Sequence, residues 1–132
     1  MSLQERQSEF AYLVAELVHY AANNGYQLRY GDAWRSTDPL PCPTCHTPHS
    51  YQEMLLAAGR SKSKNSKHAD RLAVDFLVNR ADGVPMTDPD WRKLGEFWED
   101  HGGYWGGRFG VDREVWGTQI GWDRSHFEMA IG

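Results

Sequence analysis

The sequence has no long hydrophobic run, little cysteine and no excess of basic residues. No apolar stretch approaches the ~20 residues that a membrane helix requires, and the N-terminus shows no basic region followed by an apolar core and a cleavage site. We therefore expect no membrane insertion, and accumulation in the cytoplasm of the producing cell. The net charge of -4 disfavours nucleic acid as a partner, because phosphate recognition depends on a surplus of Lys and Arg.

The remaining composition is that of one folded domain. The chain has 132 residues, of which 40% are hydrophobic and 13% aromatic, which is enough for one substantial core. It contains no internal repeat and no linker composition. We therefore treat residues 1–132 as a single domain and expect a monomer.

Local patterns predict an alternation of helices and strands. Apolar residues recur at helical spacing from Phe10 to Ala21, with Ser2 and Glu5 as a capping box and Asn24-Gly25 as the stop. Further along the chain, the patterns predict a strand over 27–34, a short helix over 50–58, a strand over 71–78, a turn at 82–83 and a helix opened by residues 88–89. This order predicts an α+β fold in which helices pack against a small, mainly antiparallel sheet.

Three residues far apart in the sequence have the chemistry of a zinc site. Zinc accepts nitrogen from neutral imidazole and oxygen from carboxylate, and a catalytic zinc keeps three protein ligands and one open position. His68, Asp75 and His126 satisfy that count. Asp123 lies three residues before His126 and is a candidate for the base that a bound water requires.

Each of these residues also has an ordinary structural interpretation. His68 and Asp75 alone could be a surface histidine and a capping aspartate, and Asp123 could form an Asx turn ahead of a strand. Glu128 shares a strand face with His126, so it is either a rival base or a partner that orients the imidazole.

The motifs around these residues resemble a known family. Ser66-x-His68, the Asp75 that follows an apolar pair, and Asp123-x-x-His126 are similar to the M15 family of zinc peptidases, which cut bacterial cell-wall peptides. The likeness runs from about residue 9 to residue 131. It is greatest to small bacteriophage endolysins that act as L-alanyl-D-glutamate endopeptidases, and to relatives that act on D-Ala-D-Ala.

The resemblance implies a role for each matched residue. It makes His68, Asp75 and His126 the ligands of one catalytic Zn²⁺ and Asp123 the catalytic acid and base. Arg35 matches an arginine that contacts substrate or the developing oxyanion beside the metal. Three further residues are expected to support the site or touch substrate, namely Ser66, Trp105 and Glu128.

The chain departs from the family pattern at two places. Many relatives have Gly where this chain has Arg71, and the stretch over 108–121 is longer than in minimal members. Both differences bear on the shape of a cleft. Trp105, Trp116 and Trp122 lie in Gly-rich segments near the expected site, where they could wall a substrate groove or pack as partly buried residues.

A second group of metal-binding side chains lies in a prolyl loop outside the family signature. It consists of Cys42, Cys45, His46 and His49. A second, structural zinc ion is one interpretation, and an ordinary loop with reduced cysteines or a short disulfide is the other. Haem attachment is disfavoured because no export signal is visible, and a nucleic-acid zinc knuckle is disfavoured by the acidic charge.

The sequence therefore predicts a zinc-dependent peptidase that hydrolyses peptidoglycan stem peptides. The bond we expect it to cut is L-Ala to D-Glu, in a phage or prophage endolysin that reaches the wall after release from the cytoplasm. A D-Ala-D-Ala carboxypeptidase or dipeptidase, and a non-catalytic zinc-stabilised domain that binds the wall, stay open as alternatives.

Overall fold

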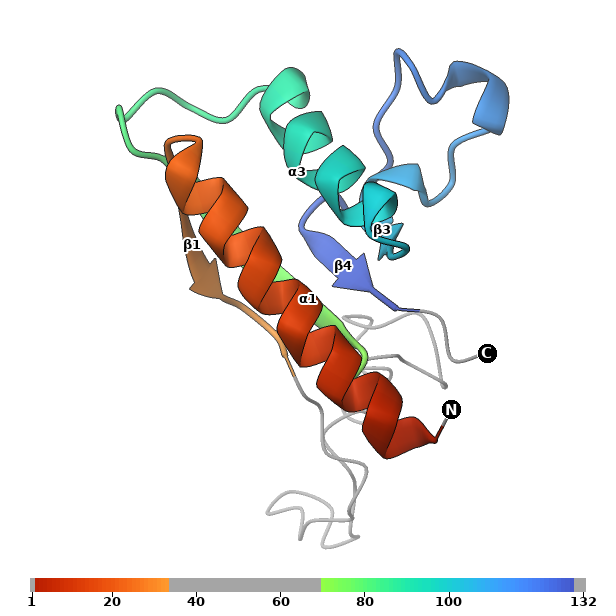
Figure 1. The fold of residues 1–132 in the computed structure, drawn as a ribbon. Coiled ribbons are helices and arrows are strands. Elements are labelled where there is room, and N and C mark those ends of the chain that lie inside the picture. Colours follow the sequence, from red (N-terminus) through yellow and green to blue (C-terminus); the bar gives the residue numbers. More distant parts are fainter. Residues whose placement is uncertain (1, 34–69, 130–132) are drawn as a thin grey trace, which may run out of the picture.

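The computed structural model describes residues 2–33 and 70–129. Within these ranges two α-helices lie against four strands (Figure 1). The helices are α1 (Leu3–Asn23) and α3 (Asp88–Asp100), and the strands are β1 (Tyr26–Tyr30), β2 (Ala73–Arg80), β3 (Tyr104–Trp105) and β4 (His126–Glu128). Two short 3₁₀ helices, η1 (Gly106–Arg108) and η2 (Arg113–Val115), interrupt the path from β3 to β4.

The predicted capping box and stop of the first helix are both confirmed. The Ser2 hydroxyl accepts the Glu5 backbone N–H at 3.1 Å, and the Glu5 carboxylate accepts the Ser2 backbone N–H at 2.8 Å. At the other end, Gly25 takes a φ of 84° just beyond the cap residue Asn24. Left-handed backbone of this kind costs glycine little and ends a helix. The face of α1 that is buried in the core carries Phe10, Leu13, Val14, Leu17 and Ala21.

The strands form one antiparallel sheet in the order β1-β2-β4-β3. Because side chains alternate along a strand, Val74, Phe76 and Phe127 point into the core while Asp75 and His126 point to the opposite face. The rings of Phe76 and Phe127 lie 6.1 Å apart within that core. The predicted α+β fold is confirmed.

Helix α3 contributes a buried aromatic side chain, Trp98, to the core. The Trp98 ring is fully buried, lies edge-on to Phe127 at 5.7 Å, and donates its indole N–H to the Glu128 carbonyl at 2.8 Å. Its other neighbour is Phe10 of α1, at 5.8 Å. Trp98 of α3 therefore contacts both α1 and β4, on the side of the sheet opposite to Asp75 and His126.

The predicted bounds of two strands are wrong. The strand predicted over 27–34 ends at Tyr30, and the strand predicted over 71–78 begins at Ala73 and runs to Arg80. Arg71 has a φ of 60°, which is left-handed backbone that a strand cannot contain. This is the position at which the M15 resemblance leads us to expect glycine, so the backbone has the glycine-type conformation although the residue is arginine.

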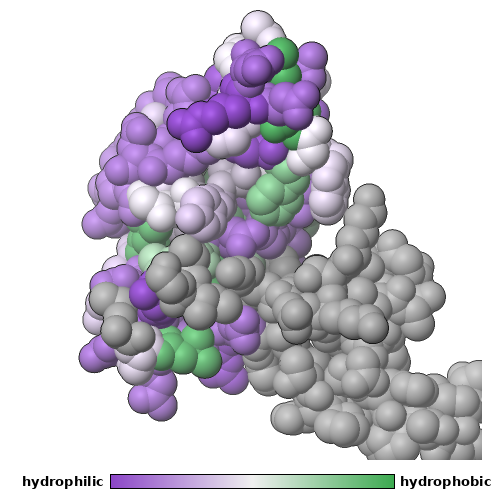
Figure 2. All heavy atoms as spheres, turned by 90° about the vertical axis from the view of Figure 1, so that its right-hand side faces the viewer, coloured by the Kyte–Doolittle hydropathy of each residue, from purple (hydrophilic) through white to green (hydrophobic). Residues whose placement is uncertain are grey.

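The coloured part of the surface in Figure 2 is mostly polar, and its apolar side chains form only small separate areas. Among the described residues, no helix is long and apolar enough to cross a membrane.

Candidate metal centre

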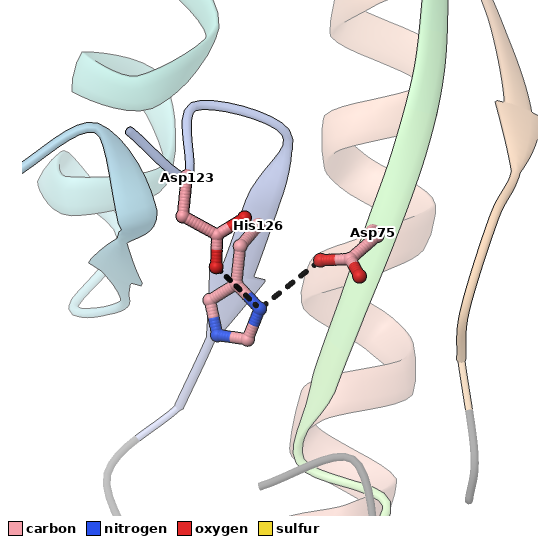
Figure 3. A group of neighbouring side chains, drawn as sticks. All are labelled: Asp75, Asp123 and His126. Carbon is pink, nitrogen blue, oxygen red and sulfur yellow. Dashed lines mark hydrogen bonds and ion pairs between the residues drawn. The ribbon is translucent and has the colours of Figure 1, made fainter. Parts of the chain in front are cut away.

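Asp75, Asp123 and His126 meet on the sheet face that points away from the core (Figure 3). Asp75 lies in β2 and is the direct register partner of His126 in β4, while Asp123 lies in the turn that leads into β4. The Asp75 carboxylate is 3.1 Å from His126 Nδ1, and the Asp123 carboxylate is 3.8 Å from the same nitrogen. The second distance is longer than a hydrogen bond.

The backbone around Asp75 is irregular. The Gly31 N–H donates to the Asp75 carbonyl at 2.7 Å, and the Asp75 N–H donates to the Asp32 carbonyl at 2.7 Å. Gly31 and Asp32, which follow β1, therefore both oppose Asp75 of β2. Two residues opposite one is the arrangement of a β-bulge. On its other side, β2 bonds the turn before β4, since the Phe76 N–H donates to the Ser125 carbonyl. Backbone bonds on both sides thus fix the position of Asp75.

The two ring nitrogens of His126 contact carboxylates on opposite sides. Nδ1 lies near Asp75 and Asp123, whereas Nε2 lies 3.1 Å from a Glu128 carboxylate oxygen. The His126 side chain is only 9% exposed. Burial lowers the pKa of His126, but the hydrogen bonds to Asp75 and Glu128 and the charges of Asp75 and Asp123 outweigh it and raise the pKa to about 9.

The donor set fits a divalent cation. One ligand atom from each of Asp75, Asp123 and His126 lies within 4.8 Å of the others. Carboxylate oxygen and imidazole nitrogen are ligands that zinc accepts. Glu128 on Nε2 completes a common arrangement, in which a carboxylate holds the far ring N–H of a ligating histidine and leaves the near nitrogen for the metal. The group can therefore bind a cation at Nδ1.

The structure brings together several residues that the sequence analysis named for the site. Asp75, Asp123, His126 and Glu128 are neighbours, and their roles as ligands, base and supporting carboxylate stay predictions. Three others named for it, Arg35, Ser66 and His68, lie outside the described ranges. The second metal group also lies outside them, namely Cys42, Cys45, His46 and His49.

Trp105 does not line a groove. Its side chain is 1% exposed, and its indole N–H donates to the Arg124 carbonyl at 2.7 Å. The interpretation of Trp105 as a substrate contact is therefore wrong, because the ring is part of the core and supports the turn before His126. Trp116 is half-buried with the Arg108 guanidinium over its ring at 4.8 Å, whereas Trp122 is 62% exposed.

Sequence reasoning missed Phe109. Its ring centroid lies 5.4 Å from that of His126 and 6.3 Å from that of Trp122. The residue lies two positions after a Gly-Gly pair and has no spacing relation to His126 that a pattern could detect. It reaches the site because the chain turns back on itself between η1 and β4, where the Gly121 N–H donates to the Gly107 carbonyl.

The fold, a small antiparallel sheet with helices on one face, has a counterpart among solved structures. The fold is similar to that of the Serratia marcescens L-Ala D-Glu endopeptidase ChiX, with a TM-score of 0.61. The alignment has 16% sequence identity and covers 93% of this chain and 79% of the ChiX chain. No protein-family model and no curated protein sequence matches this chain. At this identity the likeness shows a shared fold.

Proposed function

We propose that the chain is a zinc-dependent peptidase that hydrolyses peptidoglycan stem peptides at the L-Ala to D-Glu bond. The observation that carries this proposal is the convergence of Asp75, Asp123 and His126 on one face of the sheet. The fold shared with an L-Ala D-Glu endopeptidase supports it, because that name describes cleavage of the same bond. The proposal includes membership of the M15 family and an endolysin role, which rest on the motifs.

Asp75 and His126 would hold the ion, with His68 as the third ligand that the motif resemblance implies. Both side chains are at most one-quarter exposed, at 25% and 9%, so a cation between them would be shielded from bulk water. A bound divalent ion would polarise the scissile carbonyl and lower the pKa of water. Glu128 would hold His126 Nε2–H and so keep Nδ1 directed at Asp75 and Asp123.

Asp123 would transfer a proton from the attacking water to the leaving nitrogen. Its carboxylate lies 3.8 Å from His126 Nδ1 and is 26% exposed, which places it beside the candidate ligands and within reach of water. In hydrolysis the water oxygen bonds to the carbonyl carbon, the C–N bond breaks, and one water proton moves to the leaving nitrogen. Asp123 would accept that proton and then donate it. Arg35 would stabilise the oxyanion or a substrate carboxylate.

Digestion of purified peptidoglycan tests the proposal directly. The zinc-loaded chain should release fragments with new D-Glu amino termini, identified by mass spectrometry, and a chelator should abolish their formation. His126→Ala should prevent both zinc binding and cleavage. His101→Ala is the matched control, because that imidazole lies at the end of α3 with 38% of its side chain exposed.

The same experiment separates the alternatives. Release of D-Ala without new D-Glu amino termini would make the chain a carboxypeptidase instead, and hydrolysis of free D-Ala-D-Ala in a parallel assay would make it a dipeptidase. Zinc binding with intact peptidoglycan would leave a metal-stabilised wall-binding domain, and failure to bind zinc would overturn the metallopeptidase proposal.

A further inference from the structure

Two aromatic side chains extend the candidate site along the molecular surface. Phe109 is half-buried with its ring next to His126, and Trp122 follows at 6.3 Å from Phe109. Trp122 immediately precedes Asp123, and 62% of its surface is exposed. Within the Phe109–Trp122 pair, Phe109 therefore lies next to the candidate metal ligand His126, and Trp122 is exposed to solvent.

The Trp122 ring packs against the segment that follows η1. A Cβ added at Gly110 would lie 3.6 Å from Trp122 Cδ1 and 3.8 Å from Nε1, so the indole is in van der Waals reach of that backbone. Gly110 has a φ of 73°, which suits glycine at this turn. Phe109 contacts the indole from the same segment. Binding to a ring already supported in this way costs little conformational entropy.

The surface formed by Phe109, Gly110 and Trp122 suits one part of a peptidoglycan substrate better than the others. Phe109, Gly110 and Trp122 contribute aromatic rings and backbone but no charged side chain. The D-Glu side of the scissile bond carries carboxylates, which favour cations. On the other side, L-Ala is joined through a lactyl group to the N-acetylmuramic acid sugar, whose ring has an apolar C–H face and a polar edge. An indole combines an apolar face with one N–H donor, so it suits the sugar.

We propose that Phe109 and Trp122 form a binding site for the N-acetylmuramic acid sugar that precedes the scissile bond. This inference rests on the proposed function, because it assumes cleavage one residue away from that sugar. The aromatic pair binds the sugar ring and so directs the enzyme to stem peptides that are still attached to glycan. Trp122 is then a specificity residue and takes no part in proton transfer.

Kinetics on two substrates test the proposal. One substrate is the N-acetylated stem peptide, and the other is the same peptide linked to N-acetylmuramic acid. Trp122→Ala should raise the KM for the sugar-linked substrate about tenfold, change its kcat by less than about twofold, and leave the free peptide unaffected. Trp122→Phe should restore part of the affinity, because it keeps an aromatic face.

Tyr12→Ala is the matched control. Tyr12 is an exposed aromatic residue, at 73%, on α1, which covers the opposite face of the sheet from Asp75 and His126. Its removal should leave both substrates unaffected. An equal rise in KM for both substrates in Trp122→Ala would show a peptide contact instead, and unchanged KM for both would overturn the inference.

Calorimetry with N-acetylmuramyl-L-alanine makes this test independent of catalysis. This compound is the sugar-side product, so it should bind the wild-type chain and bind Trp122→Ala about tenfold more weakly. If the chain cuts no peptide but shows this difference, the proposed function is wrong and the sugar site stands. If the chain cuts peptidoglycan but does not bind the product through Trp122, the sugar site is wrong and the proposed function stands.

Discussion

Gly106 lies directly against the backbone carbonyl of Asp123, with no room for a side chain between them. A Cβ at Gly106 would also lie 2.8 Å from the Cβ of His126. The Trp105-Gly106-Gly107 stretch therefore has a definite function in the fold. Its second residue must be glycine because the turn carrying Asp123 and the start of β4 both pack onto it.

Gly106→Ala should displace this turn. We expect a loss of about 1–3 kcal/mol in the free energy of unfolding, as for other overpacked sites, and a fall in peptidase activity of roughly 10²-fold, because misplaced catalytic groups are costly. Urea unfolding and peptide hydrolysis measure the two effects. Gly117→Ala is the control, since no atom lies within 4 Å of its added Cβ. Equal, small effects from both substitutions would show that the turn tolerates the displacement.

Asp123→Asn should separate metal binding from catalysis. If Asp123 transfers protons, the variant keeps its zinc, while kcat falls about 10²- to 10⁴-fold. Zinc content by mass spectrometry and the rate of stem-peptide hydrolysis check this. Asp100→Asn, at an exposed position at the end of α3, is the control. Loss of zinc together with activity would instead make Asp123 a ligand, which its place among the three donor groups also permits.

Glu128→Ala should weaken zinc binding without removing any ligand. Glu128 lies 3.1 Å from His126 Nε2, and carboxylates in this position orient the imidazole and increase its basicity. We expect the Kd for zinc to rise about 10- to 100-fold, as measured by competition with a chelator. The exposed Glu114 in η2 offers a control, Glu114→Ala. An unchanged Kd would contradict the supporting role of Glu128.

Arg108 should stabilise the segment between η1 and β4. Its guanidinium donates two hydrogen bonds of 3.0 Å to Glu99 and one of 2.8 Å to the Trp116 carbonyl, and it lies 5.0 Å from the Trp105 ring. Only 11% of the side chain is exposed. Arg108→Ala should cost about 2–3 kcal/mol in the free energy of unfolding, since it removes one partner of a largely buried ion pair.

Two further variants test the geometry at Arg108. Arg108→Lys should recover little of the lost stability, because an ammonium cannot make the paired hydrogen bonds to Glu99. Arg113 lies 5.2 Å from the ring of Trp116, but its own side chain is exposed. Arg113→Ala should therefore lower the free energy of unfolding by less than about 1 kcal/mol. Similar losses for Arg108→Ala and Arg113→Ala, measured by urea unfolding, would show that the ion pair contributes nothing.

Asp90 should make the fold sensitive to acid. The hydrogen bond from the Tyr26 hydroxyl, at 2.6 Å, together with those from Thr87 and the charge of Arg80, outweighs burial and lowers the pKa of Asp90 to about 2. The folded-state pKa is below the unfolded pKa of 3.8, so this contribution is fully present above pH 4 and is lost as the pH falls toward 2.

Asp90→Asn tests this pH dependence. The variant should lose on the order of 1–2 kcal/mol of stability near neutral pH, and its stability should fall less steeply between about pH 4 and pH 2. Urea unfolding across this range measures both. Parallel curves for the wild type and the variant below pH 4 would show that Asp90 is not the group responsible.

Several elements could be predicted from the sequence because their signals are local. The capping box at Ser2 and Glu5 fixes the start of α1, and Asn24-Gly25 ends it. Apolar spacing identified the buried side of that helix, including Leu17. The alternation at His126 and Glu128 correctly placed both on one face of a strand, because side-chain direction along a strand has a period of two.

The errors arose where backbone contacts between distant segments decide the structure. The first strand ends early because Gly31 and Asp32 both oppose Asp75, and the second begins late because Arg71 takes a left-handed conformation. Trp105 and Trp122 have similar Gly-rich surroundings, yet one is 1% exposed and the other 62%. Gly95 in α3 and Gly107 in η1 leave space for the Trp105 ring, and this close packing buries it.

Local patterns indicate which side chains have metal-binding chemistry, where α1 begins and ends, and where α3 begins. The contact between Asp75 and His126, 51 residues further on, and the position of Glu128 at the opposite ring nitrogen depend on how distant strands pair. The reason is the register of β2 against β4. The alternation of side chains excludes a shift of one residue, which would turn His126 into the core and Phe127 outward. A shift of two would keep both faces and separate Asp75 from His126, and no local pattern in either strand excludes it.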